Sequence, residues 1–316
     1  MVLPPPLRAL LCQVHTFRSG GVGWFPLNKQ QITVRVPATT SNLGPGFDCL
    51  GVALQIYNYV TVTHSEGETV PMARSAARKY FKRIGVVPFP FSCTVAGNVP
   101  AARGLGSSVT VRLGVLHALN ALLDRPLKRA EIFALCAELE GHPDNAAPAE
   151  FGGFVATSAG RPQRFPVEAR LRFVLLIPDF ELETKEARKV LPNEIDRWRA
   201  IESSANACAI TAAMASANYP NLRGVFGDHL HQPYRARFVP FLDRVIAAGE
   251  AAGALGGFLS GSGSTIICVT LRSAKKVAEA MAGASGLRDP ETRITTADND
   301  GVRIAVSILN PDAALA

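Results

Sequence analysis

Several features that define broad classes of protein are missing from this 316-residue sequence. No uninterrupted apolar run approaches the ~20 residues that a membrane-spanning helix needs, so we expect no membrane partner. The six cysteines are spread along the chain without a CxxC pair, which fits neither a zinc site nor a small disulfide framework. We therefore expect reduced, mostly buried thiols in a cytoplasmic protein.

Aromatic residues make up only 7% of the chain, and no Lys/Arg cluster carries interleaved aromatics, which argues against nucleic-acid binding. The formal net charge is +7. Residues 1–31 hold three cations and no acid, so 7 − 3 leaves +4 for the rest, a surplus that suits an anionic substrate. The hydrophobic content of 47% excludes a disordered or fibrous chain, and the length predicts two domains.

Residues 1–30 differ in composition from the rest of the chain. A proline cluster is followed by a short apolar run and then by the glycine-rich SGGVG. The run is short for a signal sequence, and no basic segment precedes it. We expect a flexible tail, or a start upstream of the true one, rather than an export signal.

From residue 31 onward the patterns predict a mixed α+β fold without an internal repeat. Strands are expected at 32–36, 52–64, 91–100, 172–179, 257–270 and 302–308, the fifth entered through a Gly/Ser loop. Helices are expected at 71–84, within 103–123 after a glycine-rich turn, and at 128–140, 200–217, 236–254 and 273–283. Residues 38–51, which are small, polar and rich in glycine, predict a loop. A Pro/Arg-rich stretch at 161–170 predicts the boundary between domains at 31–165 and 166–316.

The strongest local signal is PAARGLGSS, residues 100–108. Gly104 and Gly106 let the backbone approach a ligand closely. Ser107 and Ser108 stand where the next helix begins, and free N–H groups at a helix N-terminus form a cradle for phosphate. The common fingerprints GxxxxGK[ST] and GxGxxG are absent, so an ordinary turn with a serine cap is an equal alternative for this motif taken alone.

A second polar cluster, EGHPDN, covers Glu140 to Asn145 directly after a predicted helix. It brings two carboxylates, an imidazole and an amide together within a segment bounded by glycine and proline. Glu140 and a serine of the cradle would suit Mg²⁺, which takes few protein oxygens and several phosphate oxygens. The alternative is a polar turn closed by local hydrogen bonds, but the density of convergent polar groups favours a functional site.

Three weaker features complete the set. SNLGPGFD, residues 41–48, places Asn42 and Asp48 on either side of a rigid Gly-Pro-Gly loop. SGSGS, residues 260–264, taken alone predicts a flexible turn between helix and strand. Arg188 and Arg235 stand in polar surroundings, and arginine forks suit a carboxylate, although an isolated arginine is most often solvated.

Taken in order, these motifs resemble the homoserine kinases, a family of the galactokinase, homoserine kinase, mevalonate kinase and phosphomevalonate kinase (GHMP) superfamily. The resemblance covers about residues 31–308. GLGSS and SGSG mark the superfamily, whereas SNLGPGFD, EGHPDN and HQPYR point to the family. It implies a two-domain α+β fold with an N-terminal, ATP-binding domain like ribosomal protein S5 domain 2 and a ferredoxin-like C-terminal domain. ATP and substrate would lie between the two domains.

The resemblance also implies an activity and the residues for it. The reaction would transfer phosphate from ATP, with Mg²⁺, to the hydroxyl of L-homoserine in threonine biosynthesis. The ATP phosphates would be wrapped by Pro100, Ala101, Ala102, Arg103, Gly104, Leu105, Gly106, Ser107, Ser108, Val109 and Thr110. Homoserine would be bound by Asn42, Asp48, His142, Asn145, Thr184, Arg188 and Arg235. The metal would be held by Ser107 or Ser108 with Glu140, and a supporting loop would comprise Ser260, Gly261, Ser262 and Gly263.

The chain departs from the family pattern at several positions. Val109 replaces the usual alanine after GLGSS, and Ser264 replaces the proline of SGSGP. Arg112 interrupts the face of the helix that follows the glycine-rich loop. None of these changes removes a side chain that the resemblance places in contact with a ligand.

Relatives of the mevalonate type use an aspartate as catalytic base, and Asn145 stands at that place here. An amide cannot accept a proton, which fits homoserine kinases and leaves Asp48 or Asp144 open as an assisting group. The alternatives are a mevalonate-like or sugar kinase of the same superfamily and a non-catalytic protein that binds nucleotide or threonine. Arg188 and Arg235 favour an amino-acid substrate over mevalonate, and a homodimer is left open.

Overall fold

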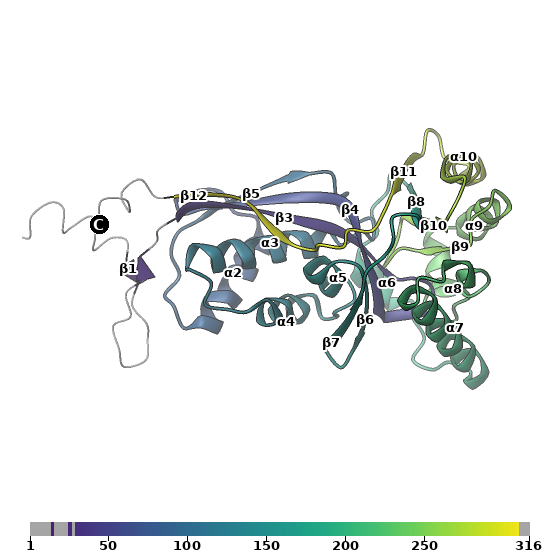
Figure 1. Ribbon diagram of the computed structural model, residues 1–316, viewed down its shortest axis with the longest axis horizontal. Helices are drawn as coiled ribbons and strands as arrows, with labels where there is room; N and C mark the ends of the chain where they lie inside the picture. The colour runs from purple at the N-terminus through teal and green to yellow at the C-terminus, as the bar shows by residue number, and fades with distance from the viewer. Residues whose placement is uncertain (1–13, 16–24, 27–28, 310–316) are drawn as a thin grey trace, which may run out of the picture.

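The computed structural model describes residues 14–15, 25–26 and 29–309 (Figure 1). Most of the expected tail, residues 1–30, therefore lies outside the described residues. Its described parts are the short strands β1 (Val14–His15) and β2 (Phe25–Pro26), which pair antiparallel with each other, and the first residues of β3.

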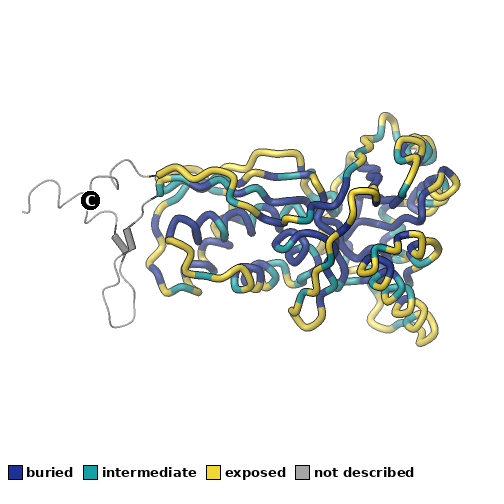
Figure 2. Tube along the Cα trace, in the orientation of Figure 1, coloured by how far each residue is buried: buried dark blue, intermediate teal, exposed yellow. Residues whose placement is uncertain are grey.

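The larger sheet has six antiparallel strands in the order β12-β3-β4-β6-β7, with β5 paired to β4. Ile32, Val34 and Val36 alternate along β3 and are buried against the helices that cover one face of the sheet (Figures 1 and 2). The strands are β3 (Lys29–Asn42), β4 (Gly46–Thr63), β5 (Ser92–Gly97), β6 (Phe154–Ser158), β7 (Arg161–Phe165) and β12 (Arg303–Leu309). The covering helices are α2 (Pro71–Ile84), α3 (Ser107–Leu122), α4 (Arg129–Glu140) and α5 (Ala146–Phe151).

The smaller sheet has four antiparallel strands in the order β11-β8-β10-β9. Val174 and Leu176 of β8 pack with α9 and α10, whereas Phe173 and Leu175 face a core shared with α7 and β4. This shared core joins the two halves of the molecule. The strands are β8 (Arg172–Ile177), β9 (Gly256–Leu259), β10 (Ile266–Thr270) and β11 (Glu291–Thr295). The helices are α6 (Thr184–Lys189), α7 (Arg197–Ala215), α8 (Gln232–Arg235), α9 (Leu242–Ala251) and α10 (Ala274–Ser285), with 3₁₀ turns η1 (Tyr219–Leu222) and η2 (Ala236–Phe238).

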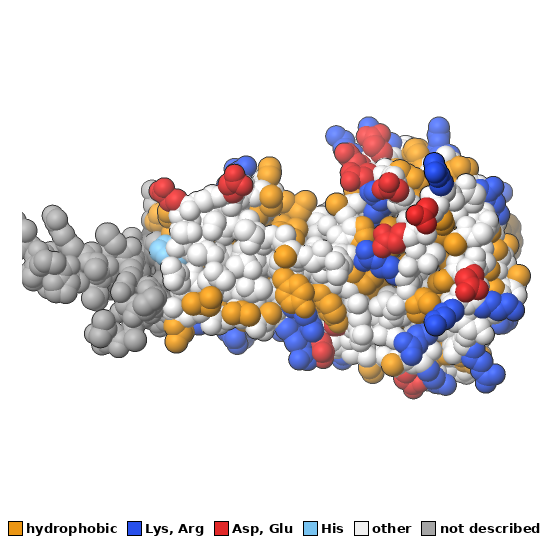
Figure 3. Space-filling view, turned by 90° about the horizontal axis from the view of Figure 1, so that it is seen from above, with side chains coloured by type: hydrophobic (Ala, Val, Ile, Leu, Met, Phe, Trp, Pro, Cys, Tyr) orange, Lys and Arg blue, Asp and Glu red, His pale blue; other side chains and the backbone are white. Residues whose placement is uncertain are grey.

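On the face of the molecule seen in Figure 3, the two halves differ in surface character. Figure 3 shows mainly uncharged side chains over the larger sheet and gathered Lys, Arg, Asp and Glu side chains over the half that holds the smaller sheet. Among the described residues, no helix has both the length and the apolar character needed to cross a membrane. Cys93, Cys136 and Cys268 are buried, and the cysteines in the described part of the chain are free thiols.

The predicted α+β class is confirmed, but the loop predicted over residues 38–51 is wrong. Strand β3 continues to Asn42 and β4 begins at Gly46, so only a tight turn separates them. The small polar residues of this segment are buried, and their hydroxyls bond across the fold. Thr39 donates to Asn145 Oδ1 at 2.8 Å, and the hydroxyls of Thr40 and Ser260 lie 2.8 Å apart.

The last strand returns to the first sheet. β12 pairs antiparallel with β3, although the chain has by then completed the four-stranded sheet with β11. The division into residues 31–165 and 166–316 stays a prediction, and one strand of the second stretch belongs to the sheet of the first.

Candidate active site

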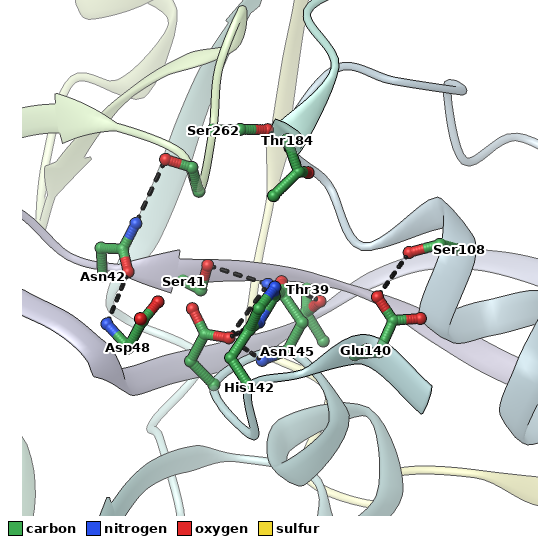
Figure 4. Close-up of polar contacts among 12 residues, drawn as sticks. Thr39, Ser41, Asn42, Asp48, Ser108, Glu140, His142, Asn145, Thr184 and Ser262 are labelled. Atoms are coloured by element: carbon green, nitrogen blue, oxygen red, sulfur yellow. Dashed lines mark hydrogen bonds and ion pairs between the residues drawn. The ribbon is translucent and has the colours of Figure 1, made fainter. Parts of the chain in front are cut away.

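A cavity of about 620 Å³ collects residues from every motif singled out in the sequence (Figure 4). The expected site residues that line it are Asn42, Asp48, Ala101, Ala102, Arg103, Gly104, Leu105, Gly106, Ser107, Ser108, Glu140, His142, Asn145, Thr184, Arg188, Arg235, Gly261 and Ser262. Those that do not line it are Pro100, Val109, Thr110, Ser260 and Gly263. Val109 is fully buried in the core under α3, and Thr110 bonds to Asn58 Nδ2.

The glycine-rich loop ends at the N-terminus of α3. Gly104 and Gly106 have φ of +74° and +67°, in the left-handed region. A Cβ on Gly104 would lie 2.1 Å from the carbonyl oxygen of Ser260, and one on Gly106 would lie 2.1 Å from Thr39 Oγ1. The first turn of α3 holds no acidic residue, so its free N–H groups and positive dipole end are open to an anion.

The loop at residues 260–264 supports the glycine-rich loop from the other half of the molecule. Ser260 Oγ donates to the carbonyl oxygen of Gly104 at 2.7 Å. The backbone N–H of Thr265 donates to the carbonyl oxygen of Arg103 at 3.2 Å. At the other side of the cavity Thr184 and Ser262 face each other, with their hydroxyl oxygens 3.4 Å apart (Figure 4).

A serine and a glutamate lie next to this helix N-terminus. Ser108 Oγ donates to Glu140 Oε2 at 2.9 Å, and both residues line the cavity (Figure 4). The Glu140 side chain is only 8% exposed, and its Oε1 lies 2.5 Å from Nη1 of Arg112. Two oxygen donors beside an anion cradle are chemically suited to Mg²⁺.

A second group of ionisable side chains lies deeper, where Asp48, His142 and Asp144 have ligand atoms within 4.8 Å of one another. His142 Nδ1 lies 2.6 Å from Asp144 Oδ1. Burial opposes the charge on His142, but the hydrogen bond and negative charge of Asp144 outweigh it and raise the pKa of His142. Burial would likewise raise the pKa of Asp144, but the bond from His142 and its charge lower it. Each of the two groups therefore favours the charged form of the other.

Arg188 and Asp48 form a two-pronged ion pair, with Nη2 to Oδ1 at 2.6 Å and Nη1 to Oδ2 at 3.1 Å. Both side chains are about one-third exposed, at 36% and 33%, so a ligand in the cavity can reach either partner. The sequence analysis predicts that each of the two residues binds the substrate, whereas in the structure they form an ion pair with each other.

Arg235 is only 2% exposed and is held by hydrogen bonds on one side of its guanidinium. Its Nε donates to the carbonyl oxygen of Ala187 at 3.2 Å, and Nη1 donates to that of Gly261 at 2.8 Å. Its Nη2 makes no hydrogen bond to a residue in the described part of the chain. Burial, together with the cation of Arg188, lowers the pKa of Arg235 to about 10, so it remains charged at neutral pH.

Phe47 and His231 also belong to the site, although neither was singled out within SNLGPGFD and HQPYR. The guanidinium carbons of Arg188 and Arg235 lie 5.3 and 5.2 Å from the centre of the Phe47 ring. His231 stacks on the same ring with centroids 5.2 Å apart. The spacing of His231 and Arg235, four residues apart at a short helix, was the one available signal.

The hydrogen bonds of His231 determine which of its ring nitrogens carries a proton. Nε2 lies 2.8 Å from the carbonyl oxygen of Gly44, which only accepts, and Nδ1 lies 3.2 Å from Nη1 of Arg235, which only donates. His231 is therefore neutral with its proton on Nε2. Burial, together with the cation of Arg235, outweighs the charge of Asp228 and lowers the pKa of His231 to about 4.

Two asparagine amides complete the wall of the cavity (Figure 4). Asn145 accepts from Thr39 at Oδ1 and donates from Nδ2 to Ser41 at 2.9 Å. Asn42 accepts from the backbone N–H of Asp48 at 3.0 Å and donates to the carbonyl oxygen of Gly261 at 3.1 Å. Asn42 is thus fully engaged in shaping the loop, and Asn145 cannot take a proton.

Comparison with known proteins agrees with this arrangement. Residues 71–153 match the family described as GHMP kinases N terminal domain, and residues 209–286 match the one described as GHMP kinases C terminal. A homoserine kinase of Moorella thermoacetica is 40% identical over 270 residues, which cover 79% of this chain and 91% of that protein. This chain belongs to the homoserine kinase family of GHMP kinases. The predicted two-domain GHMP kinase fold is thereby confirmed.

Other members of the homoserine kinase family are similarly close. A homoserine kinase of Trichormus variabilis is 40% identical over 275 residues, covering 80% of this chain and 91% of that protein. The crystal structure of a homoserine kinase from Cytophaga hutchinsonii superposes with a TM-score of 0.80 at 26% identity, covering 87% of this chain and 98% of that one. A mevalonate kinase structure superposes with a TM-score of 0.66 at 14% identity, which shows a shared fold alone.

Proposed function

We propose that this chain is a homoserine kinase, which transfers the γ-phosphate of ATP to the hydroxyl of L-homoserine and releases ADP and O-phospho-L-homoserine. The reaction is a step of threonine biosynthesis. The observation that carries the proposal is one cavity that joins a phosphate cradle at the start of α3 to a zwitterion-binding end made by Asp48, Arg188 and Arg235. Family membership supports the same assignment.

The nucleotide occupies the end of the cavity that residues 101–108 line. The backbone N–H groups of the glycine-rich loop and the first turn of α3 face the β- and γ-phosphates there. Stabilising the charge of these phosphates at a helix N-terminus accelerates transfer, since phosphoryl transfer depends mainly on positioning and electrostatics. The loop at 260–264 holds the glycine-rich loop in that shape through Gly104.

The amino acid occupies the other end. The guanidinium fork of Arg188 can bind a carboxylate with two parallel hydrogen bonds, and Arg235 adds Nη2, its one nitrogen without a hydrogen bond in the described part of the chain, so both bind the α-carboxylate. Asp48 binds the α-ammonium group. Homoserine inserts into the Asp48–Arg188 pair and offers each partner an opposite charge, which keeps both charges compensated when water is displaced.

The hydroxyl of homoserine then points toward the γ-phosphate, near Thr184, His142 and Asn145. Because Asn145 is an amide with both ends bonded, its contribution is to position the hydroxyl rather than to accept its proton. Holding the two reactants in line supplies most of the rate enhancement in this scheme.

Mg²⁺ belongs at Ser108 and Glu140, where two oxygen donors face the cradle. When bound, the ion would neutralise charge on the β- and γ-phosphates. We further propose that residues 31–165 form the ATP-binding domain and residues 166–316 the second domain, and that the protein works in the cytoplasm.

A coupled assay of ADP release over homoserine, mevalonate, shikimate and galactose tests the proposal. We expect turnover with homoserine alone, because an arginine clamp and Asp48 together select an α-amino acid. Turnover with mevalonate and not with homoserine would favour the mevalonate-like alternative. Binding of nucleotide without turnover of any substrate would favour the non-catalytic alternative.

A further inference from the structure

Arg112 is a residue that departs from the family pattern, and it lies at the cavity. It follows Ser108 by one turn of α3, so the two side chains share a face of the helix. Both reach the same residue on α4, because Nη1 of Arg112 lies 2.5 Å from Glu140 Oε1 while Ser108 donates to Oε2. Nη1 also donates to the carbonyl oxygen of Leu139 at 2.9 Å. Arg112 lines the cavity beside the helix N-terminus.

The Glu140 carboxylate therefore accepts a hydrogen bond from Ser108 at Oε2, and at Oε1 it has the ion pair with Arg112 but no hydrogen-bond partner among the described residues. It is 8% exposed, and the guanidinium beside it compensates its charge. A divalent cation placed between Ser108 and Glu140 would lie within a few ångströms of that guanidinium. A single and a double positive charge about 5 Å apart weaken binding by at least roughly tenfold even with the screening of bulk water, and more in a partly buried site.

The guanidinium of Arg112 can exchange Glu140 for the phosphate oxygens of a bound nucleotide. Its Nε is buried and lacks a hydrogen-bond partner among the described residues, so the contact with Glu140 leaves one donor unused. A bound nucleotide brings several phosphate oxygens to the start of α3. These oxygens can compensate a metal ion and a guanidinium together, which one carboxylate does not do.

We propose that Arg112 holds Glu140 in an ion pair in the free protein, so that the divalent metal ion binds at this site only together with the nucleotide. The proposal rests on the proposed function for the identity of the nucleotide and for Glu140 as a metal ligand. It assigns a role to a residue that sets this chain apart from the family pattern. It also predicts an order of binding, with the metal–nucleotide complex rather than the free ion as the species that is bound.

Binding of Mn²⁺, followed by electron paramagnetic resonance without nucleotide, tests the proposal directly. We expect Arg112→Gln to bind Mn²⁺ at least about tenfold more tightly than the unchanged protein. Helices α3 and α4 stay packed together in this variant through their buried apolar residues. The double variant Arg112→Gln, Glu140→Gln should lose the gain, which locates the ion at Glu140.

Lys185→Gln is the matched control, because Lys185 also lines the cavity and its loss changes the net charge equally. We expect this variant to bind Mn²⁺ like the unchanged protein. With ADP present, the unchanged protein should bind Mn²⁺ tightly and the advantage of Arg112→Gln should shrink. Melting curves show that each variant is folded, and Arg112→Met is a second neutral replacement.

Two results would overturn the proposal. The first is that the unchanged protein, without nucleotide, binds Mn²⁺ as tightly as both neutral variants of Arg112. The second is that Lys185→Gln gains as much as Arg112→Gln, which would make the effect one of net charge. Since no arm of the experiment uses homoserine, an incorrect amino-acid substrate would leave the outcome unchanged and would be found separately in the ADP-release assay.

Discussion

At the scale of single residues, the hydrogen bonds of Arg235 within the described part of the chain leave one of its nitrogens available to a ligand. Arg235 uses Nε and Nη1 on neighbouring carbonyl oxygens and keeps Nη2 open. His231 uses both ring nitrogens, one of them on Arg235. A guanidinium held in this way loses little side-chain entropy when a carboxylate binds, so the affinity of the clamp depends on its neighbours as well as on its charge.

Replacing Arg235 by leucine is expected to raise the KM for homoserine and to leave the KM for ATP nearly unchanged. Loss of a charged hydrogen-bond donor costs about 1.5–3 kcal/mol, which is roughly a ten- to hundredfold loss in kcat/KM. Arg235→Lys keeps the charge without the fork, so it should recover part of the loss. Steady-state kinetics with each substrate varied in turn measures both effects.

The substrate control for Arg235 is 2-amino-1,4-butanediol, which keeps the amine and the reacting hydroxyl but has no carboxylate. We expect it to be a poor substrate whose low kcat/KM barely changes in Arg235→Leu. An equal loss of affinity for ATP and homoserine in this variant would instead give Arg235 a role in the fold or in nucleotide binding.

Replacing Glu140 by glutamine is expected to lower kcat/KM by roughly ten- to hundredfold through weaker metal binding, with the fold intact. An amide keeps the shape of the side chain, and its one oxygen can still accept from Arg112 while its NH2 group donates to Ser108 Oγ, but it lacks the charge. Kinetics over a range of Mg²⁺ concentrations measures the change. Near-normal activity at limiting Mg²⁺ would remove Glu140 from the metal site.

His231 should make stability depend on pH. Its folded pKa of about 4 lies below its ordinary value of 6.5, so its contribution is complete above pH 6.5 and is lost as pH falls toward 4. Between pH 7 and pH 5 the loss is about 2 kcal/mol. Urea unfolding of the protein and of His231→Phe, which keeps the stacking on Phe47, should show a smaller pH dependence in the variant. A pH-independent difference between the two would contradict the neutral, buried state of His231.

At the scale of elements, the sequence predicted most long helices and strands because their periodicity is strong. Helix α2 covers the residues expected for it, β8 and β10 lie within theirs, and β12 ends one residue beyond its expected range. Residues 38–51 were predicted as a loop because small polar residues and glycine normally mark one. They form strands here because Thr39, Thr40 and Ser41 find buried partners on other elements, which no local pattern records.

The glycine-rich loop should not tolerate a side chain at Gly104. Gly104→Ala places a Cβ 2.1 Å from a backbone oxygen of Ser260, at a φ of +74°. The strained φ and the overpacking together are expected to cost about 2–4 kcal/mol and to weaken nucleotide binding. The matched control is Gly283→Ala in α10, where a Cβ meets nothing within 4 Å and alanine favours the helix by up to about 1 kcal/mol.

Thermal melting and titration with a fluorescent ATP analogue measure the effect of both glycine variants. We expect Gly104→Ala to lower both Tm and affinity, and Gly283→Ala to leave affinity unchanged while holding or raising Tm. Equal behaviour of the two variants would mean that the close approach of Gly104 to Ser260 is unimportant for the site.

At the scale of the whole molecule, the site depends on contacts between segments far apart in the sequence. The order of motifs predicted the family and the cavity's lining, because each motif carries its own residues. It did not predict that Arg188 pairs with Asp48, because 140 residues separate them and only the assembled fold brings them together. For the same reason it did not predict that Phe47 contacts both arginines.

The strands near the two ends of the chain differ in how they contact the rest of the fold. The residues that line the cavity begin at Ser41, and β3 is held from its first residue, because Lys29 Nζ donates to the carbonyl oxygen of Ala121 at 2.9 Å. Among the described residues, β1 and β2 pair with each other and with no other strand. Strand β12, by contrast, pairs with β3 along its length.

Deleting residues 1–28, with a new initiating methionine, is therefore expected to leave kcat, both KM values and Tm nearly unchanged. Ending the chain before Val302 should prevent stable folding, because it exposes the edge of β3 and removes Val302 and Ile304 from the core that packs against the larger sheet. Kinetics and thermal melting of the two truncated proteins, made side by side, measure the contrast. A large fall in Tm on deleting residues 1–28 would show that this segment packs against the folded protein, and a stable protein without β12 would show that the six-stranded sheet does not need its returning strand.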